Sequence, residues 1–196
     1  MIAIVDYGAG NLYSVKKAFD YLGADVVVTN QPGPVTAADK IVLPGVGHFS
    51  SLQALDRAGL REALLQGASA GKPFLGICLG MQWLFQGSEE CIEVAGARIF
   101  PGNCKPFPSS VKSPHVGWNS LEIQDGSLLL RNIAQGSFVY YTHSFHAPVA
   151  AATVAATEYG VRFAGAVEQG NIFGVQFHPE KSGDVGLSLL KTFCEV

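Results

Sequence analysis

The chain alternates short apolar runs with longer stretches in which apolar residues recur at helical spacing. Helices are predicted from Leu12 to Leu22, closed by Gly23 as its C′ residue, from Ser50 or Ser51 to Leu65 with a break at Gly59, and from about Leu79. The apolar runs predict strands at Ile2–Val5, Val26–Val28, Ile41–Leu43 and Pro73–Ile77. Strand, helix and strand in this order predict a parallel sheet covered by helices.

From about Ala97 the pattern changes to short strand-like pieces separated by Gly, Pro, Asn and Ser. These predict strands at 117–123, 138–145, 153–157, 162–167 and 172–177, which we expect to add to the sheet in antiparallel fashion. A last helix is predicted over Gly183–Phe193. Since no internal repeat, low-complexity tract or linker interrupts the chain, we expect residues 1–196 to form a single α/β domain.

Composition narrows the class of partner. Of 196 residues, 48% are apolar and 15% charged, and the net charge of −3 provides no basic footprint for a nucleic acid. The N-terminus lacks the pattern of a signal peptide, and no apolar run approaches the length of a membrane span. The four cysteines contain no Cys-x-x-Cys pair, so we expect a reducing, cytoplasmic setting without membrane association.

The sharpest chemical signal is Gly76-Ile77-Cys78-Leu79-Gly80, between a predicted strand and a predicted helix. A nucleophile on such a tight turn needs small residues two positions before and after it, and this run matches the Gly-x-nucleophile-x-Gly elbow with cysteine in place of serine. The amides at the start of the helix would favour the thiolate. The alternative is a buried cysteine in an ordinary glycine-rich turn.

A thiolate nucleophile also needs a group that accepts and donates protons. Of five histidines, His178 stands out because it follows the apolar run 172–177 and precedes Pro179 and Glu180. Pro179 disfavours helix at His178, and in an extended segment Glu180 would lie on the same side and orient the imidazole. Cys78, His178 and Glu180 therefore form a candidate nucleophile, base and orienter. The alternative for His178 is a surface loop after a strand.

Acyl transfer further requires amides aimed at an oxyanion. Candidates are the N–H of Leu79 and that of Val46 or Gly47, in a predicted Pro44-Gly45-Val46-Gly47 loop after a neighbouring strand. Pro-Gly-x-Gly by itself is typical of a simple turn.

Other patterns do not support cofactor binding. Gly8-Ala9-Gly10 fails as a dinucleotide fingerprint because Tyr13 stands at the third glycine position, and the run 143–146 is a poor metal motif. No metal or organic cofactor is expected. Cys91, Cys104 and Cys194 lack a comparable elbow and are interpreted as packing or surface residues.

Taken together, these motifs resemble the class I, or triad, glutamine amidotransferases, and more narrowly the glutaminase subunits of imidazole glycerol phosphate synthase, an enzyme of histidine biosynthesis. The resemblance covers nearly the whole chain. It rests on six runs in the right order: residues 6–11, 43–47, 76–82, 114–119, 143–145 and 174–182.

The resemblance implies a flavodoxin-like three-layer fold, mainly parallel in its sheet, and hydrolysis of glutamine to glutamate and ammonia through a thioester on Cys78. It assigns the oxyanion contacts to the Val46 and Leu79 amides, and the substrate contacts to Gly47, Gln82, His143 and Ser144. Phe145 and His146 depart from the tyrosines that the family often carries there, which puts any local hydroxyl contact in doubt.

The resemblance also implies a partner chain that consumes the ammonia. This is the cyclase subunit, a β/α barrel that makes imidazole glycerol phosphate and aminoimidazole carboxamide ribotide, and we expect a heterodimer with it. The interface candidates are Asn11, Pro114, Trp118, Asn119, Tyr140 and Lys181. For Trp118 and Tyr140 the alternative is core packing. Glycines on both sides of Val46 suggest a peptide plane that reorients when the cyclase and its ligand bind.

Two other functions remain open at this point. One is a glutaminase that serves another synthase, which the single valine between the loop glycines and the Pro114–Asn119 run disfavour. The other is a catalytically silent subunit that only binds its partner, which the presence of all three triad residues disfavours.

Overall fold

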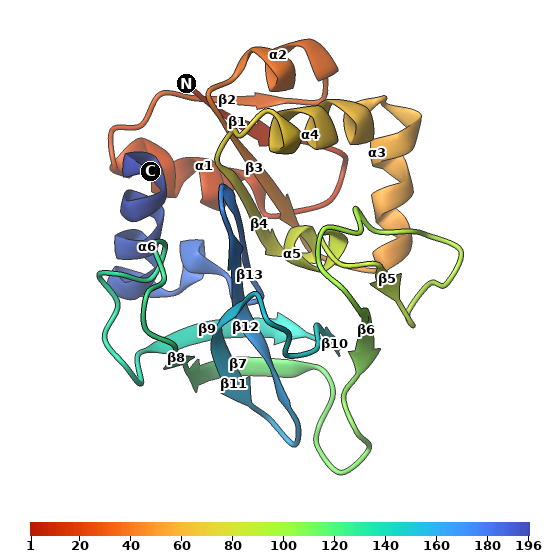
Figure 1. Ribbon diagram of the computed structural model, residues 1–196, viewed down its shortest axis with the longest axis vertical. Coiled ribbons are helices and arrows are strands. Elements are labelled where there is room, and N and C mark those ends of the chain that lie inside the picture. Colours follow the sequence, from red (N-terminus) through yellow and green to blue (C-terminus); the bar gives the residue numbers. More distant parts are fainter.

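The computed structural model describes residues 1–196 and is organised around an eight-stranded sheet of order β2-β1-β3-β4-β13-β12-β11-β8 (Figure 1). Strands from β2 to β13 run parallel, whereas β12, β11 and β8 join antiparallel. The predicted α/β class is therefore confirmed. The strands of this sheet are β1 (Ile2–Val5), β2 (Val26–Thr29), β3 (Lys40–Gly45), β4 (Phe74–Cys78), β8 (Glu122–Ile123), β11 (Thr153–Glu158), β12 (Arg162–Gln169) and β13 (Ile172–Val175).

Helices cover both faces of the sheet, as the three-layer prediction requires (Figure 1). On one face α1 (Leu12–Tyr21) packs against α6 (Gly183–Glu195), where the rings of Phe19 and Phe193 meet edge to face at 6.4 Å. The other face carries α2 (Pro32–Ala37), the 3-10 helix η1 (Phe49–Leu52), α3 (Gln53–Arg57) and α4 (Leu60–Ser69). Alternate residues of β1 enter the two separate cores on either side.

Two predicted strands turn out to be split between different sheets. β7 (His115–Ser120) pairs antiparallel with β9 (Phe138–His143), and this pair is called the β7–β9 ribbon below. β8 joins the large sheet instead, and β10 (Phe145–His146) pairs with β6 (Asn103–Pro106), which in turn pairs with β5 (Gly87–Ser88). Period-two alternation indicates a strand but not its partner, because pairing depends on residues far away in the chain.

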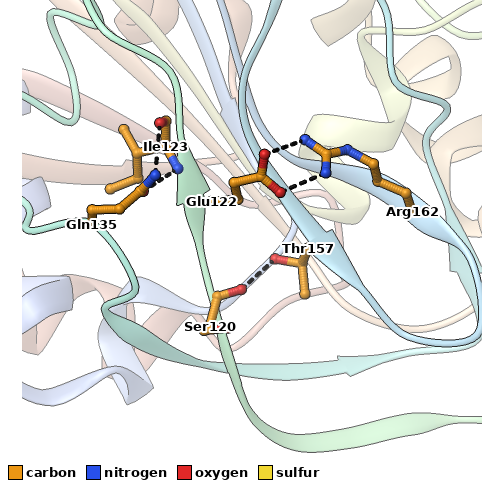
Figure 2. A network of polar contacts seen from close by, with 6 residues as sticks. All are labelled: Ser120, Glu122, Ile123, Gln135, Thr157 and Arg162. Carbon is orange, nitrogen blue, oxygen red and sulfur yellow. Dashed lines mark hydrogen bonds and ion pairs between the residues drawn. The ribbon is translucent and has the colours of Figure 1, made fainter.

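Polar contacts fasten the edge strand β8 and the adjoining end of the ribbon (Figure 2). The two terminal guanidinium nitrogens of Arg162 donate to the carboxylate of Glu122, Nη2 at 2.8 Å. The Thr157 hydroxyl donates to the Ser120 carbonyl oxygen at 3.0 Å, and Gln135 bonds both backbone groups of Ile123 in β8. The ribbon is thereby anchored to β11, and β8 is anchored to β12.

Several local predictions are confirmed and one is corrected. Gly23, with φ of +73°, closes α1 and Gly59, with φ of +68°, separates α3 from α4, both as expected. The helix α5 (Leu79–Trp83) begins at Leu79. Pro44 and Gly45 were expected in a loop but belong to β3, because the Gly45 backbone pairs in register with Cys78 of β4. No helix combines the length and apolar character needed to cross a membrane.

Candidate active site

Cys78 occupies a strained turn where β4 ends and α5 begins. Its φ of +53° and ψ of −106° are rarely adopted by a residue with a side chain. The flanking glycines leave no room for a Cβ: at Gly76 it would lie 2.6 Å from the Gly80 carbonyl oxygen, and at Gly80 it would overlap the carbonyl oxygen of Leu43. The predicted elbow is therefore present, with small residues required on both sides of the cysteine.

His178 lies three residues after the end of β13, and its ring is held by Glu180. The Nδ1 atom lies 2.9 Å from Glu180 Oε1, and both side chains are only 1% exposed. The backbone is fixed as well, because the His178 N–H donates to the Tyr140 carbonyl oxygen at 2.9 Å and the Ser182 hydroxyl donates to the His178 carbonyl oxygen at 2.7 Å. The predicted pair forms, although Glu180 sits on the 3-10 helix η2 (Pro179–Lys181) rather than on an extended segment.

Electrostatics favour a charged imidazole at this position. Burial lowers the pKa of His178, but Cys78 and Glu180 together outweigh it and raise that pKa to about 10. Nδ1–H therefore donates to the Glu180 carboxylate, which fixes the ring, while no hydrogen-bond partner occupies Nε2. A nucleophile, a proton carrier and an orienting carboxylate are thus assembled at the carboxyl ends of β4 and β13.

Cys78 and Leu79 open onto a cavity of about 230 Å³. Its other lining residues are Gly47, Gln82, Glu90, Pro114, Thr142, His143, Ser144 and Phe145. All four residues predicted to contact substrate are among them, and Pro114, predicted at the partner interface, forms part of the wall. Val46 is half-buried and lies outside the lining, next to Gly47.

Sequence reasoning missed two polar residues of the site. Glu90 lines the cavity, and its Oε2 accepts a hydrogen bond from the Phe49 N–H at 2.8 Å. Gln176 is fully buried, and its Nε2 lies 3.6 Å from Cys78 Sγ. Glu90 belongs to no recognisable motif, so no local signal pointed to it. For Gln176 the only signal was its place two residues before His178.

The two glycines that flank Val46 have different roles. A Cβ on Gly45 would overlap the Tyr7 hydroxyl and lie 2.8 Å from Leu79 Cβ, so this glycine permits close packing beneath the elbow. Gly47 has φ of +103°, and a Cβ there would meet no atom within 4 Å. The backbone freedom that the sequence suggested on both sides of Val46 is therefore restricted to Gly47.

Three of the residues predicted at the partner interface, Trp118, the half-buried Tyr140 and Lys181, form one surface group called the Trp118 cluster. Trp118 is 55% exposed, its ring meets that of Tyr140 edge to face at 6.0 Å, and Lys181 Nζ lies 5.7 Å from the centre of the Tyr140 ring. Core packing is thereby excluded for Trp118. Asn119 is used internally, donating to the Glu158 carbonyl oxygen at 3.0 Å, and Asn11 precedes α1 as its N-cap.

The remaining cysteines fall in different surroundings. Cys104 is fully buried in the core, as a packing residue is expected to be, and burial raises the pKa of its thiol. Cys91 and Cys194 are partly exposed.

Comparison with known proteins identifies the family. The model of the glutamine amidotransferase class-I family matches residues 3–195. The chain belongs to the class I glutamine amidotransferases. Among curated relatives of this amidotransferase, the imidazole glycerol phosphate synthase subunit HisH of Moorella thermoacetica is 48% identical, with 100% of this chain and 94% of the relative covered. The HisH subunit of Methanothermobacter thermautotrophicus is 49% identical over 100% of this chain and 98% of its own.

Solved structures of distant sequence share the amidotransferase fold. A crystal structure of a glutamine amidotransferase superposes with a TM-score of 0.78 at 15% identity, covering 100% of both chains. The structure of PurLQS from Thermotoga maritima gives a TM-score of 0.78 at 20% identity, with 99% of this chain and 97% of that chain covered. At these identities the likeness concerns the fold alone.

Proposed function

We propose that Cys78, His178 and Glu180 hydrolyse L-glutamine to glutamate and ammonia, and that the chain supplies this ammonia to the cyclase subunit of imidazole glycerol phosphate synthase. The observation that carries the proposal is the cysteine elbow open to a polar cavity, with a buried His178–Glu180 pair beside it. The amidotransferase family makes glutamine the nitrogen donor. The full-length similarity to HisH subunits points to this synthase.

The chemistry follows from the three side chains. The Cys78 thiolate adds to the amide carbon of glutamine, and the resulting oxyanion is stabilised by backbone N–H groups, of which Leu79 and Val46 are the candidates. Protonated His178 gives its Nε2 proton to the leaving nitrogen, so the C–N bond breaks and a thioester and ammonia form. Neutral His178 then takes a proton from water, whose oxygen attacks the thioester and releases glutamate. Glu180 keeps the imidazole in place throughout.

The cavity suits the charged end of an amino acid. Glu90 is the one acidic side chain in its lining, and Phe49 binds only one of its oxygens, so the other can accept from an α-ammonium group. Gln82 donates its amide N–H groups to protein acceptors, which leaves its Oε1 for a second donor of the substrate. Gly47, His143 and Ser144 complete the wall as substrate contacts.

The ammonia must reach a second active site before it is protonated in water. The Trp118 cluster is the docking surface that we assign to the cyclase subunit in a heterodimer, and the His178 N–H bond to the Tyr140 carbonyl oxygen connects that cluster to the triad. Asn11 and Asn119 are further candidates at this interface. We place the subunit in the cytoplasm, where a reducing environment keeps the Cys78 thiol available.

Glutamate release from glutamine by the purified chain tests this function. It is measured with and without the cyclase subunit and a ligand for the cyclase site, with Cys78→Ala as the control. Strong stimulation by the liganded cyclase, absent in Cys78→Ala, supports both the chemistry and the partner.

Other outcomes would point elsewhere. Activity that ignores the cyclase would retain the triad but indicate another synthase. The absence of activity under all conditions would favour a silent binding subunit. Full activity of the isolated chain would refute the idea that partner binding reorients the Val46 peptide.

A further inference from the structure

An unbroken series of hydrogen bonds connects Cys78 to the β7–β9 ribbon, and the direction of each bond follows from one backbone carbonyl. Phe145 O can only accept, and both Gln82 Nε2 at 2.7 Å and His143 Nδ1 at 2.9 Å lie within reach of it. Gln82 must therefore present its NH₂ group to Phe145, and His143 must carry its proton on Nδ1. The Phe145 carbonyl therefore determines the amide orientation of Gln82 and the proton position on His143.

Towards the nucleophile, the same reasoning fixes Gln176. Gln82 Nε2 also lies 3.1 Å from a side-chain atom of Gln176, which must be the acceptor Oε1 because Gln82 Nε2 donates. The amide nitrogen of Gln176 then points to Cys78 Sγ, at 3.6 Å. The strands explain the proximity: β13 and β4 pair with Val175 opposite Ile77, so the residues that follow them lie side by side.

Away from the nucleophile, two histidines continue the series. His115 Nδ1 lies 3.1 Å from His143 Nε2, and burial lowers the pKa of His115 to about 4 and that of His143 to about 3. Both rings are therefore neutral near pH 7. Because His143 already carries its proton on Nδ1, His115 must be the donor to His143 Nε2.

Two tyrosines hold the His115 ring, Tyr141 from the β7–β9 ribbon and Tyr159 from the segment after β11. The His115 ring stacks on Tyr159 at 4.0 Å and on Tyr141 at 4.9 Å between ring centres. The Tyr141 hydroxyl lies 2.7 Å from the Thr157 hydroxyl of β11. His115 does not line the cavity, so it contacts neither substrate nor nucleophile directly.

We propose that Gln176 is a further catalytic residue, whose side-chain N–H stabilises the Cys78 thiolate, and that His115 is a positioning residue that orients Gln82 and Gln176 through His143 and the Phe145 carbonyl. The proposal rests on the proposed function, because it assigns roles within the same site. A hydrogen bond to a charged acceptor favours the charged form, so loss of this donor makes the thiolate harder to form. Loss of the His115 donor leaves His143, and with it the Gln82 amide, less firmly placed for substrate.

The first test measures thiolate formation without glutamine turnover. The rate of Cys78 alkylation by iodoacetamide is followed from pH 5 to 10 by mass spectrometry of the Cys78 peptide, in wild type, Gln176→Met and Gln176→Glu. We expect the rate at pH 7 to fall about tenfold in Gln176→Met, the effect of one hydrogen bond to a charged group, with the pH midpoint moving upward. Gln176→Glu keeps an acceptor for Gln82 but lacks an N–H when ionised, and it should behave similarly.

The control is Asn171→Ala, at the opposite end of β13. The Asn171 side chain donates to the carbonyl oxygens of Ala68 and Lys72. The substitution therefore removes a partly buried amide that has a structural role and no contact with Cys78. It should lower thermal stability and leave Cys78 alkylation unchanged. A folded Gln176→Met or Gln176→Glu variant with the wild-type alkylation profile and kcat would overturn the catalytic assignment.

The second test addresses His115. His115→Phe keeps an aromatic ring between the two tyrosines but has no N–H, so we expect the KM for glutamine to rise roughly fivefold, as for one neutral hydrogen bond, with kcat changed less. An unchanged KM in the folded variant would refute the positioning role. If the wild type hydrolyses no glutamine even with the cyclase, the proposed function fails, while the alkylation profiles still decide the role of Gln176.

Discussion

Gly80, in the first turn of α5, lies directly against the backbone of Leu43 in β3. A Cβ added to Gly80 would overlap the Leu43 carbonyl oxygen, and a Cβ added to Gly45 of the same strand would lie 2.8 Å from Leu79 Cβ. The nucleophile elbow therefore touches the strand that leads into the Val46–Gly47 loop. The position of Cys78 and the position of the candidate oxyanion loop depend on the same backbone contact.

Gly80→Ala tests this contact. Because the obstacle is a backbone carbonyl in a paired strand, the elbow must shift, and we expect a loss of at least about 2 kcal/mol of unfolding free energy together with most glutaminase activity. Gly67→Ala in α4 is the matched control, since the added Cβ would meet the flexible Cδ1 end of the Ile41 side chain of β3. Urea unfolding of both variants should separate them clearly. Equal losses would show that the Leu43 contact has no special importance.

The raised pKa of His178 predicts a pH-dependent contribution to stability. The folded value of about 10 lies above the ordinary 6.5, so the contribution is complete below pH 6.5 and is lost as the pH rises through 10. Cys78→Ser removes one of the two groups that raise this pKa. We therefore expect the difference in unfolding free energy between wild type and Cys78→Ser to shrink between pH 6.5 and 10. Chemical unfolding at several pH values measures this difference. An advantage that stays constant over this interval would contradict the assigned charge state of His178.

Glu90→Gln tests the recognition of the α-ammonium group. The substitution keeps the shape of the side chain and its bond to Phe49 N–H but removes the charge, so the KM for glutamine should rise about tenfold and kcat should change little. Glu89→Gln is the control, because Glu89 is exposed and lies outside the cavity lining. Steady-state kinetics that give the two variants the same KM would exclude Glu90 from substrate binding.

The sequence predicted the parallel half of the fold well because its elements are marked locally. β1 and β4 each show an apolar run, and α1 shows a helical period that ends at Gly23. α2 was not predicted, since Pro32-Gly33-Pro34 is typical of a turn, although proline is well tolerated in the first turn of a helix. The β7–β9 ribbon was not predicted, because the partner of a strand is decided by distant residues rather than by the alternation of apolar and polar residues within the strand.

The residues of the active site likewise fall into those marked by local motifs and those recognised only in the structure. Cys78 and His178 were recognisable because an elbow and a His-Pro-Glu turn are compact motifs with a stated chemical reason. Glu90 enters the cavity only because the segment after α5 folds back over it, and Gln176 acquires meaning only through its amide partners. Three-dimensional contacts, and not spacing, identify both.

Trp118→Ala tests the docking surface. Trp118 is 55% exposed and contacts Tyr140, so its removal should change the unfolding free energy by less than about 0.5 kcal/mol. Large aromatic side chains often contribute most of the binding energy of an interface, so the Kd for the cyclase subunit should rise at least about 30-fold. Titration calorimetry measures this Kd. Ile92→Ala is the control, because Ile92 is 81% exposed and lies in the segment before β6, outside the ribbon. If Ile92→Ala weakens binding and Trp118→Ala does not, the partner docks on a different face of the molecule.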